Sequence, residues 1–275
     1  MNTFSMGESK YYCSKFSQMS GDSEKSIKDF QRSYLQNATI LKEGTGLFNE
    51  YRDCSLRNIE RLIFLSASNY FRSASLLASS SAPWAHVTLY YGSFFAANAL
   101  LGLWGCTIFQ KYIVEVDNGT CGHQRLRVRC IGTNGEPTVK GGSHEQFWAI
   151  FYNTAAQIKP VILPEYRIAL EPIQNSSSWL IEKRNQVNYD SYNGICSVVN
   201  FGNNFNATQF PQSLPGDLNV QFKTLKTLLN AVRHYAKEFG LSTDALYNIQ
   251  NGCNWDNIIN NHICLMTPPD ISITY

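Results

Sequence analysis

Apolar residues recur every three to four positions over much of the chain, which is the spacing of a helix that buries one face. The pattern predicts six main helices, at about 22–43, 53–80, 84–104, 143–158, 179–190 and 217–239. Local signals mark their ends. Gly44 and Gly46 close the first, Pro83 fits the first turn of the third, Ser143 caps the fourth, Asp217 caps the sixth and Gly240 ends it.

The third predicted helix, Trp84 to Trp104, contains no charged residue. A helix that is apolar on every side either lies in the middle of a bundle or crosses a bilayer. His86 and Asn98 lie within it and basic residues do not flank it, which favours the bundle. We therefore expect this helix at the centre of the fold and no membrane association.

The spacing changes to alternation between residues 111 and 143. Lys111–Asp117 and Gln124–Cys130 are both typical of strands, and the Asn118–Gly119 turn signal lies between them. These residues predict a β-hairpin inserted into an otherwise helical domain. The fold class is thus mainly α, a helical bundle with a small β-hairpin insertion.

Three segments are expected along the chain. Residues 1–21 are predicted to be a polar arm, and 22–192 a helical bundle with the β insertion at about 111–143. Residues 193–275 are predicted to begin as a long loop, with a strand at about 195–201, and to continue into C-terminal helices that complete or cap the bundle.

Arg125, Arg127 and Arg129 alternate along the second predicted strand, so their side chains share one face. The row can contact the phosphates of RNA. The alternative is pairing with Glu115 and Asp117 on the facing strand.

Charge and cysteine content narrow the ligands and the cellular location expected for the protein. The net charge is +2, so bulk charge gives no argument for nucleic acid, and any such binding needs a local patch. The eight cysteines form no Cys-x-x-Cys pair, and the first residues lack a secretory signal. We expect reduced thiols and a cytoplasmic location.

A zinc site was considered at Cys121, His123, Cys130 and His144. The spacing of these residues fits no known zinc motif, so neither a metal nor another cofactor is expected.

The segment RNQVNYDSY, residues 184–192, contains the most specific group of polar residues. Arg184 and Asn188 are four apart and share a helix face, while Asn185 and Tyr189 share another. Such a group can hold a phosphate. The alternative for Arg184 is an ion pair with Glu182 or Asp190.

Three motifs together resemble the HEPN superfamily, the nucleotide-binding domains of higher eukaryotes and prokaryotes. They are YYGSFFAANALLGLWG at 90–105, SHEQFWAIF at 143–151 and EKRNQVNYDSY at 182–192. The resemblance covers roughly residues 53–192 and implies a helical bundle that forms a homodimer. In active members, paired Arg-x4-6-His motifs make a metal-independent endoribonuclease.

The resemblance implies roles for individual residues. Arg184 matches the arginine that holds the scissile phosphate, and Asn185 matches the polar residue that follows it. Tyr189 stands where the family has histidine, so it either works with a lowered pKa or stacks on RNA. His144 either substitutes as the proton carrier or bonds locally at its helix start. Tyr192 and His144 are further candidate RNA contacts.

Two functions follow from the resemblance. The first is an RNA-cleaving toxin or antiviral-defence effector with a composite dimeric site at Arg184, Asn185 and Tyr189. The alternative is a non-catalytic module that binds RNA, a nucleotide or a protein. The expected partners are RNA, a second copy of the chain, and a cognate antitoxin or defence-system protein.

Overall fold

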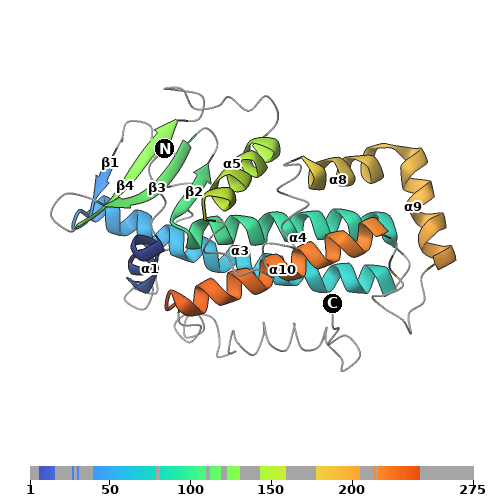
Figure 1. The fold of residues 1–275 in the computed structure, drawn as a ribbon, viewed down its shortest axis with the longest axis horizontal. Coiled ribbons are helices and arrows are strands. Elements are labelled where there is room, and N and C mark those ends of the chain that lie inside the picture. Colours follow the sequence, from blue (N-terminus) through green and yellow to red (C-terminus); the bar gives the residue numbers. More distant parts are fainter. Residues whose placement is uncertain are drawn as a thin grey trace.

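A computed structural model describes residues 6–15, 27, 30, 40–78, 81–109, 112–118, 123–130, 143–158, 178–204, 214 and 216–241. It is mainly helical with one small antiparallel sheet, as the hydrophobic pattern predicts (Figure 1). The helices are α1 (Met6–Ser14), α3 (Gly46–Ala78), α4 (Ala82–Leu103), α5 (Ser143–Ile158), α8 (Trp179–Tyr189), α9 (Ser191–Asn204) and α10 (Gly216–Glu238). The strands are β1 (Ile40–Lys42), β2 (Cys106–Phe109), β3 (Tyr112–Asn118) and β4 (Gln124–Cys130).

Helix α4 is the centre of the bundle, where its sequence places it. It packs against α3 on one side and α10 on another, and α5, α8 and α9 also contact it (Figure 1). Its first turn contains Pro83, as predicted, because proline lacks the N–H that a helix start leaves unpaired. None of the helices in the described part of the chain combines the length and apolar character that crossing a bilayer requires.

Close packing of α4 depends on small residues. A Cβ added at Gly102 would lie 2.6 Å from Cγ1 of Ile59 on α3, so only glycine permits this approach. At the end of α4, Gly105 has φ of 77°, and an added Cβ would lie 2.8 Å from the Ser9 hydroxyl. This glycine turns the chain from α4 into β2.

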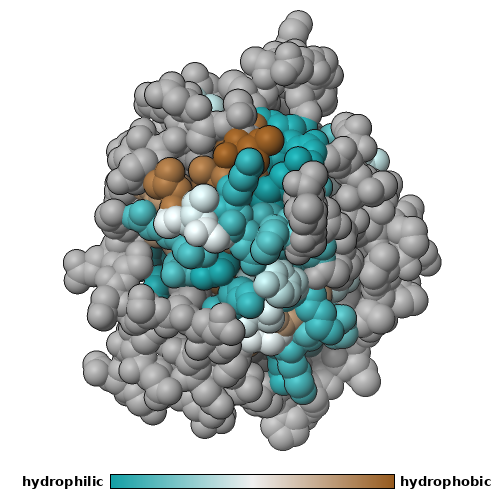
Figure 2. Space-filling model, turned by 90° about the vertical axis from the view of Figure 1, so that its left-hand side faces the viewer, coloured by the Kyte–Doolittle hydropathy of each residue, from teal (hydrophilic) through white to brown (hydrophobic). Residues whose placement is uncertain are grey.

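The β-hairpin is confirmed as β3 and β4, but the sheet is larger than predicted. Its order is β1-β4-β3-β2, and every neighbouring pair is antiparallel. Figure 2 views the molecule from the sheet end, where the described surface is mostly hydrophilic with a small hydrophobic group.

The region before α3 differs from the sequence prediction. Residues 27 and 30 are helical, but Leu41, assigned to the same helix, is the inward residue of β1. The expected helix therefore does not reach residue 43. Gly46 begins α3 instead of ending the previous helix, so α3 starts seven residues before the expected position 53.

Part of the polar arm predicted for residues 1–21 is a packed helix. Residues 6–14 form α1, and Tyr12 and Cys13 on it are buried. The Ser9 hydroxyl donates a 2.8 Å hydrogen bond to the Trp104 carbonyl at the end of α4, and the Gln124 amide donates to the Glu8 carbonyl. These bonds hold α1 against α4 and the sheet.

Two predictions for the C-terminal third are wrong in part. Residues 195–201, expected to be a strand in a loop, belong to α9. Asp217 lies in the first turn of α10, one residue inside the helix, and pairs with Lys183 of α8 at 2.8 Å. Gly240 ends that helix at φ 72°, as predicted. The expected helices and tail after residue 241 lie outside the described residues.

Candidate functional site

Three helices bring polar side chains together around Tyr90 of α4. The Tyr90 ring is fully buried, and its hydroxyl lies 2.6 Å from Nδ1 of His144 on α5. The guanidinium of Arg184 on α8 lies over the same ring, 4.6 Å from its centroid. One phenol thus uses its hydroxyl for His144 and its face for Arg184.

Aromatic residues fix the position of His144. Its ring stacks on Phe94, with centroids 4.4 Å apart and planes 28° apart, and meets Tyr91 edge to face at 6.2 Å. Phe147 in turn packs on Phe94 at 4.7 Å. The imidazole is held in one orientation, half-buried, with its Nδ1 directed at Tyr90.

The electrostatics of His144 and Tyr90 follow from this packing. Burial lowers the pKa of His144 below its ordinary value, and the charge of Arg184 acts in the same direction. Burial raises the pKa of the Tyr90 hydroxyl, against the opposing effects of Trp148 and Arg184. At neutral pH the imidazole is therefore neutral and the phenol keeps its proton.

Arg184 forms an ion pair with neither Glu182 nor Asp190, the two partners of the alternative interpretation. Its Nε and one terminal nitrogen both donate to Oδ1 of Asn185, at 3.1 and 2.7 Å. Glu182 accepts from the Ser178 hydroxyl, and Asp190 accepts from backbone N–H groups at the start of α9. Among the described residues no carboxylate forms an ion pair with Arg184, and its side chain is half-buried. Within the described residues, the Arg184 side chain donates its hydrogen bonds to an uncharged amide.

Tyr189, predicted as a catalytic residue, does not share this cluster. It ends α8, five residues after Arg184 and about 140° around the helix, and is 76% exposed. Tyr192 on α9 is 74% exposed. Both tyrosines face away from the packed core, and Asn188 is also exposed.

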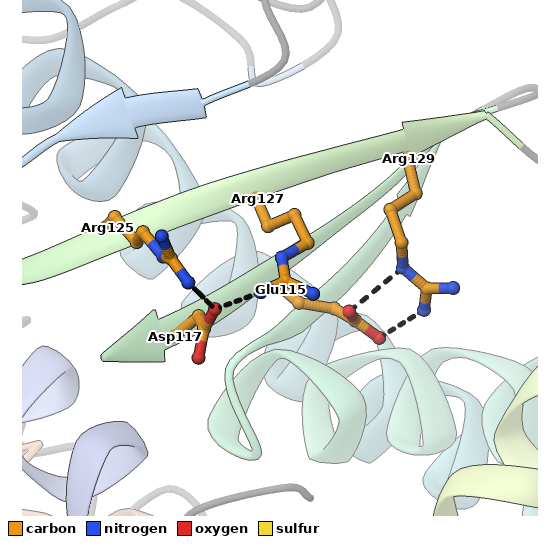
Figure 3. A network of polar contacts seen from close by, with 5 residues as sticks. All are labelled: Glu115, Asp117, Arg125, Arg127 and Arg129. Carbon is orange, nitrogen blue, oxygen red and sulfur yellow. Dashed lines mark hydrogen bonds and ion pairs between the residues drawn. The ribbon is translucent and has the colours of Figure 1, made fainter. Parts of the chain in front are cut away.

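The arginine row on β4 is paired across the sheet (Figure 3). Arg125 and Arg127 both donate to Oδ2 of Asp117, at 2.8 and 2.5 Å, and Arg129 donates to both oxygens of Glu115. All five side chains are partly exposed. The row therefore has the alternative arrangement considered from the sequence, with three cations sharing two carboxylates.

The residues considered for zinc do not gather in the described part of the chain, where no group of three His, Cys, Asp or Glu side chains could hold a metal ion. Cys121 lies outside the described residues. His144 is instead committed to Tyr90.

The sequence pattern does not single out Tyr90, because a tyrosine inside an apolar helix is usually a core residue. Its contacts with His144 and Arg184 arise from the packing of α5 and α8 on α4, so no signal in the sequence could have found it.

Comparison of the chain with protein-family models, curated proteins and solved structures gave no match.

Proposed function

We propose that this protein is a HEPN-like, metal-independent endoribonuclease that acts in the cytoplasm as a toxin or antiviral-defence effector. The observation that carries the proposal is the convergence of Arg184 and His144 on Tyr90, from three helices that carry the three motifs. An arginine without a described counter-ion and a neutral imidazole N–H can together stabilise the charge of a phosphate in the transition state without a metal.

Each residue has a distinct role in this proposal. Arg184 binds the scissile phosphate through its fork of N–H donors, and Asn185 fixes the orientation of that fork by accepting two of them. His144 supplies a neutral imidazole that can donate a second hydrogen bond to the same phosphate.

The proposed enzyme is a homodimer, and α9 supports a surface for the second copy. Tyr189, Tyr192, Ile195, Val198 and Val199 form what we call the α9 apolar strip, and each is 47% exposed or more. Helix α9 contains no charged residue, so two copies of the strip can meet without charge repulsion.

The size of the α9 apolar strip also fits a dimer. Its five side chains expose on the order of 500 Å² per copy, against about 800 Å² per partner in a stable interface, and a polar rim would supply the remainder. Because the strip begins at the end of α8, dimer contact there would bring the two Arg184 sites close to the interface.

The test is incubation of the purified chain with cellular RNA in EDTA. Wild type is expected to cleave, Arg184→Ala to lose at least about a hundredfold in rate, and Arg233→Ala, an exposed arginine on α10, to cleave normally. Circular dichroism checks that each variant is folded. A folded wild-type dimer that cleaves no RNA would contradict the nuclease proposal.

A second candidate is a non-catalytic module that binds RNA, a nucleotide or a protein, including a cognate antitoxin or defence-system partner. The position of Tyr189 favours it, because the residue at the usual place of the catalytic histidine is an exposed tyrosine outside the cluster. In that case Arg184→Ala would weaken binding of RNA to a chain that never cleaves it.

A further inference from the structure

The Tyr90 hydroxyl carries a proton that needs a hydrogen-bond acceptor. It is fully buried, and a buried O–H group without an acceptor is unfavourable. Within the described part of the chain, Nδ1 of His144 is the acceptor within hydrogen-bond distance of this hydroxyl. The neighbouring Trp148 indole carries only a donor and cannot take the proton.

These contacts decide which nitrogen of His144 carries hydrogen. A neutral imidazole has one N–H and one acceptor nitrogen, and the bond at one nitrogen sets the state of the other. If Nδ1 were the donor toward Tyr90, the phenol would be left without an acceptor. If Nδ1 accepts, the hydrogen of His144 is on Nε2, which points away from Tyr90.

We propose that Tyr90 is a positioning residue that donates to Nδ1 of His144, so that the neutral imidazole presents Nε2–H beside the Arg184 guanidinium to one phosphoryl group. The proposed function supplies the identity of that ligand as an RNA phosphate. The tautomer itself depends only on the contacts of Tyr90. His144 thus meets the phosphate as a hydrogen-bond donor.

The two contacts of Tyr90 also fix the spacing between these donors. The ring face holds Arg184 and the hydroxyl, in the plane of the ring, holds His144. Phe94 prevents the imidazole from turning. Arg184 and His144 are therefore kept at a constant separation by a rigid phenol, although their helices are distant in sequence.

Nitrogen NMR of the full-length protein with labelled histidine measures the tautomer directly at pH 8, and His144→Gln assigns the signal. The Nε2–H form is expected in wild type and a mixture of both forms in Tyr90→Phe, which keeps the ring and removes the hydroxyl. Tyr91→Phe is the matched control and should match wild type, because Tyr91 meets the imidazole edge to face. An Nδ1–H form in wild type, or a mixture that Tyr90→Phe leaves unchanged, would overturn the proposal.

Inorganic phosphate is the probe for the ligand. Its addition should shift the Nε2–H signal in wild type, with an affinity at least about tenfold weaker in Arg184→Gln. Absence of any shift overturns the phosphoryl assignment. Neither NMR experiment measures RNA cleavage, so the two proposals can fail separately. A chain that shows the Nε2–H tautomer and the phosphate-induced shift but does not cleave RNA would refute the proposed nuclease and support this inference.

Discussion

His86 of α4 and Gln221 of α10 are joined by a 2.6 Å hydrogen bond inside the core, where both side chains are buried. Lys183 and Asp217, which pair with each other between α8 and α10, are the charged groups that act on His86. Burial lowers the pKa of His86 below its ordinary 6.5, and this is the largest effect on it. The bond therefore belongs to the neutral imidazole.

The pH dependence of stability follows from this shift. Below about pH 6.5 the unfolded chain binds a proton at His86 before the folded chain does, so folding stability falls as pH falls. The slope from one such group is at most about 1.4 kcal/mol per pH unit. His86→Asn, which retains an N–H donor for Gln221, is expected to reduce this loss.

The measurement is urea unfolding of both proteins from pH 8 to 5. Glu60 makes stability rise as pH falls in this range, because burial raises its pKa to about 7. The informative quantity is therefore the difference in free energy of unfolding between wild type and His86→Asn. At pH 8 that difference reports packing alone. A difference that stays constant down to pH 5 would contradict the assignment.

The catalytic role should follow the structure and not the linear motif. His144→Gln is expected to slow RNA cleavage by roughly a hundredfold, since removal of one donor to the transition state costs about 10²–10³. Tyr189→Phe should slow it less than about tenfold, because Tyr189 is exposed and outside the cluster. Single-turnover rates on a short labelled RNA decide between them, and the reverse order would return the role to Tyr189.

A charge placed in the α9 apolar strip should separate the proposed dimer. Ile195→Asp would bury two carboxylates in the symmetric contact and is expected to weaken association by at least about a hundredfold. Leu65→Asp is the control, because Leu65 is similarly exposed but lies on α3. Sedimentation velocity gives the dissociation constants, and equal constants for both variants would rule out this face.

The arginine row should become a better RNA contact when its counter-ion is removed. Asp117→Asn frees Arg125 and Arg127 from the carboxylate that they share. We expect the salt dependence of RNA binding to steepen by roughly one unit of log–log slope, with a stability cost of about 1 kcal/mol or less. Glu238→Gln makes the same change of charge on α10, and an equal steepening there would show only a bulk effect.

The accuracy of the sequence predictions depended on how local each signal was. The central helix could be predicted because its apolar residues and Pro83 lie within one segment. Strand β1 could not, because its three residues are ordered by pairing with β4, far along the chain. Helix α9 was missed because its glycines and asparagines resemble a loop, although Asp190 provides a start signal by accepting from Tyr192 and Asn193.

In the candidate site, too, local contacts could be predicted and contacts between distant segments could not. Arg184 and Asn185 are neighbours in sequence, so their association could be predicted. The meeting of Arg184 with His144 depends on how α5 and α8 pack on α4, and no spacing in the sequence encodes it. The role predicted for Tyr189 comes only from the resemblance, which puts a histidine at this place, whereas the fold directs its side chain into solvent.

The packing of α1 against α4 and the sheet has a consequence for the order of folding. Its contacts with Trp104 and Gln124 join residues separated by 95 and 116 positions. During synthesis the ribosome releases α1 long before these partners exist, and contacts over such separations form slowly. Helix α1 must therefore wait for α4 and the sheet, so it docks only after they have formed.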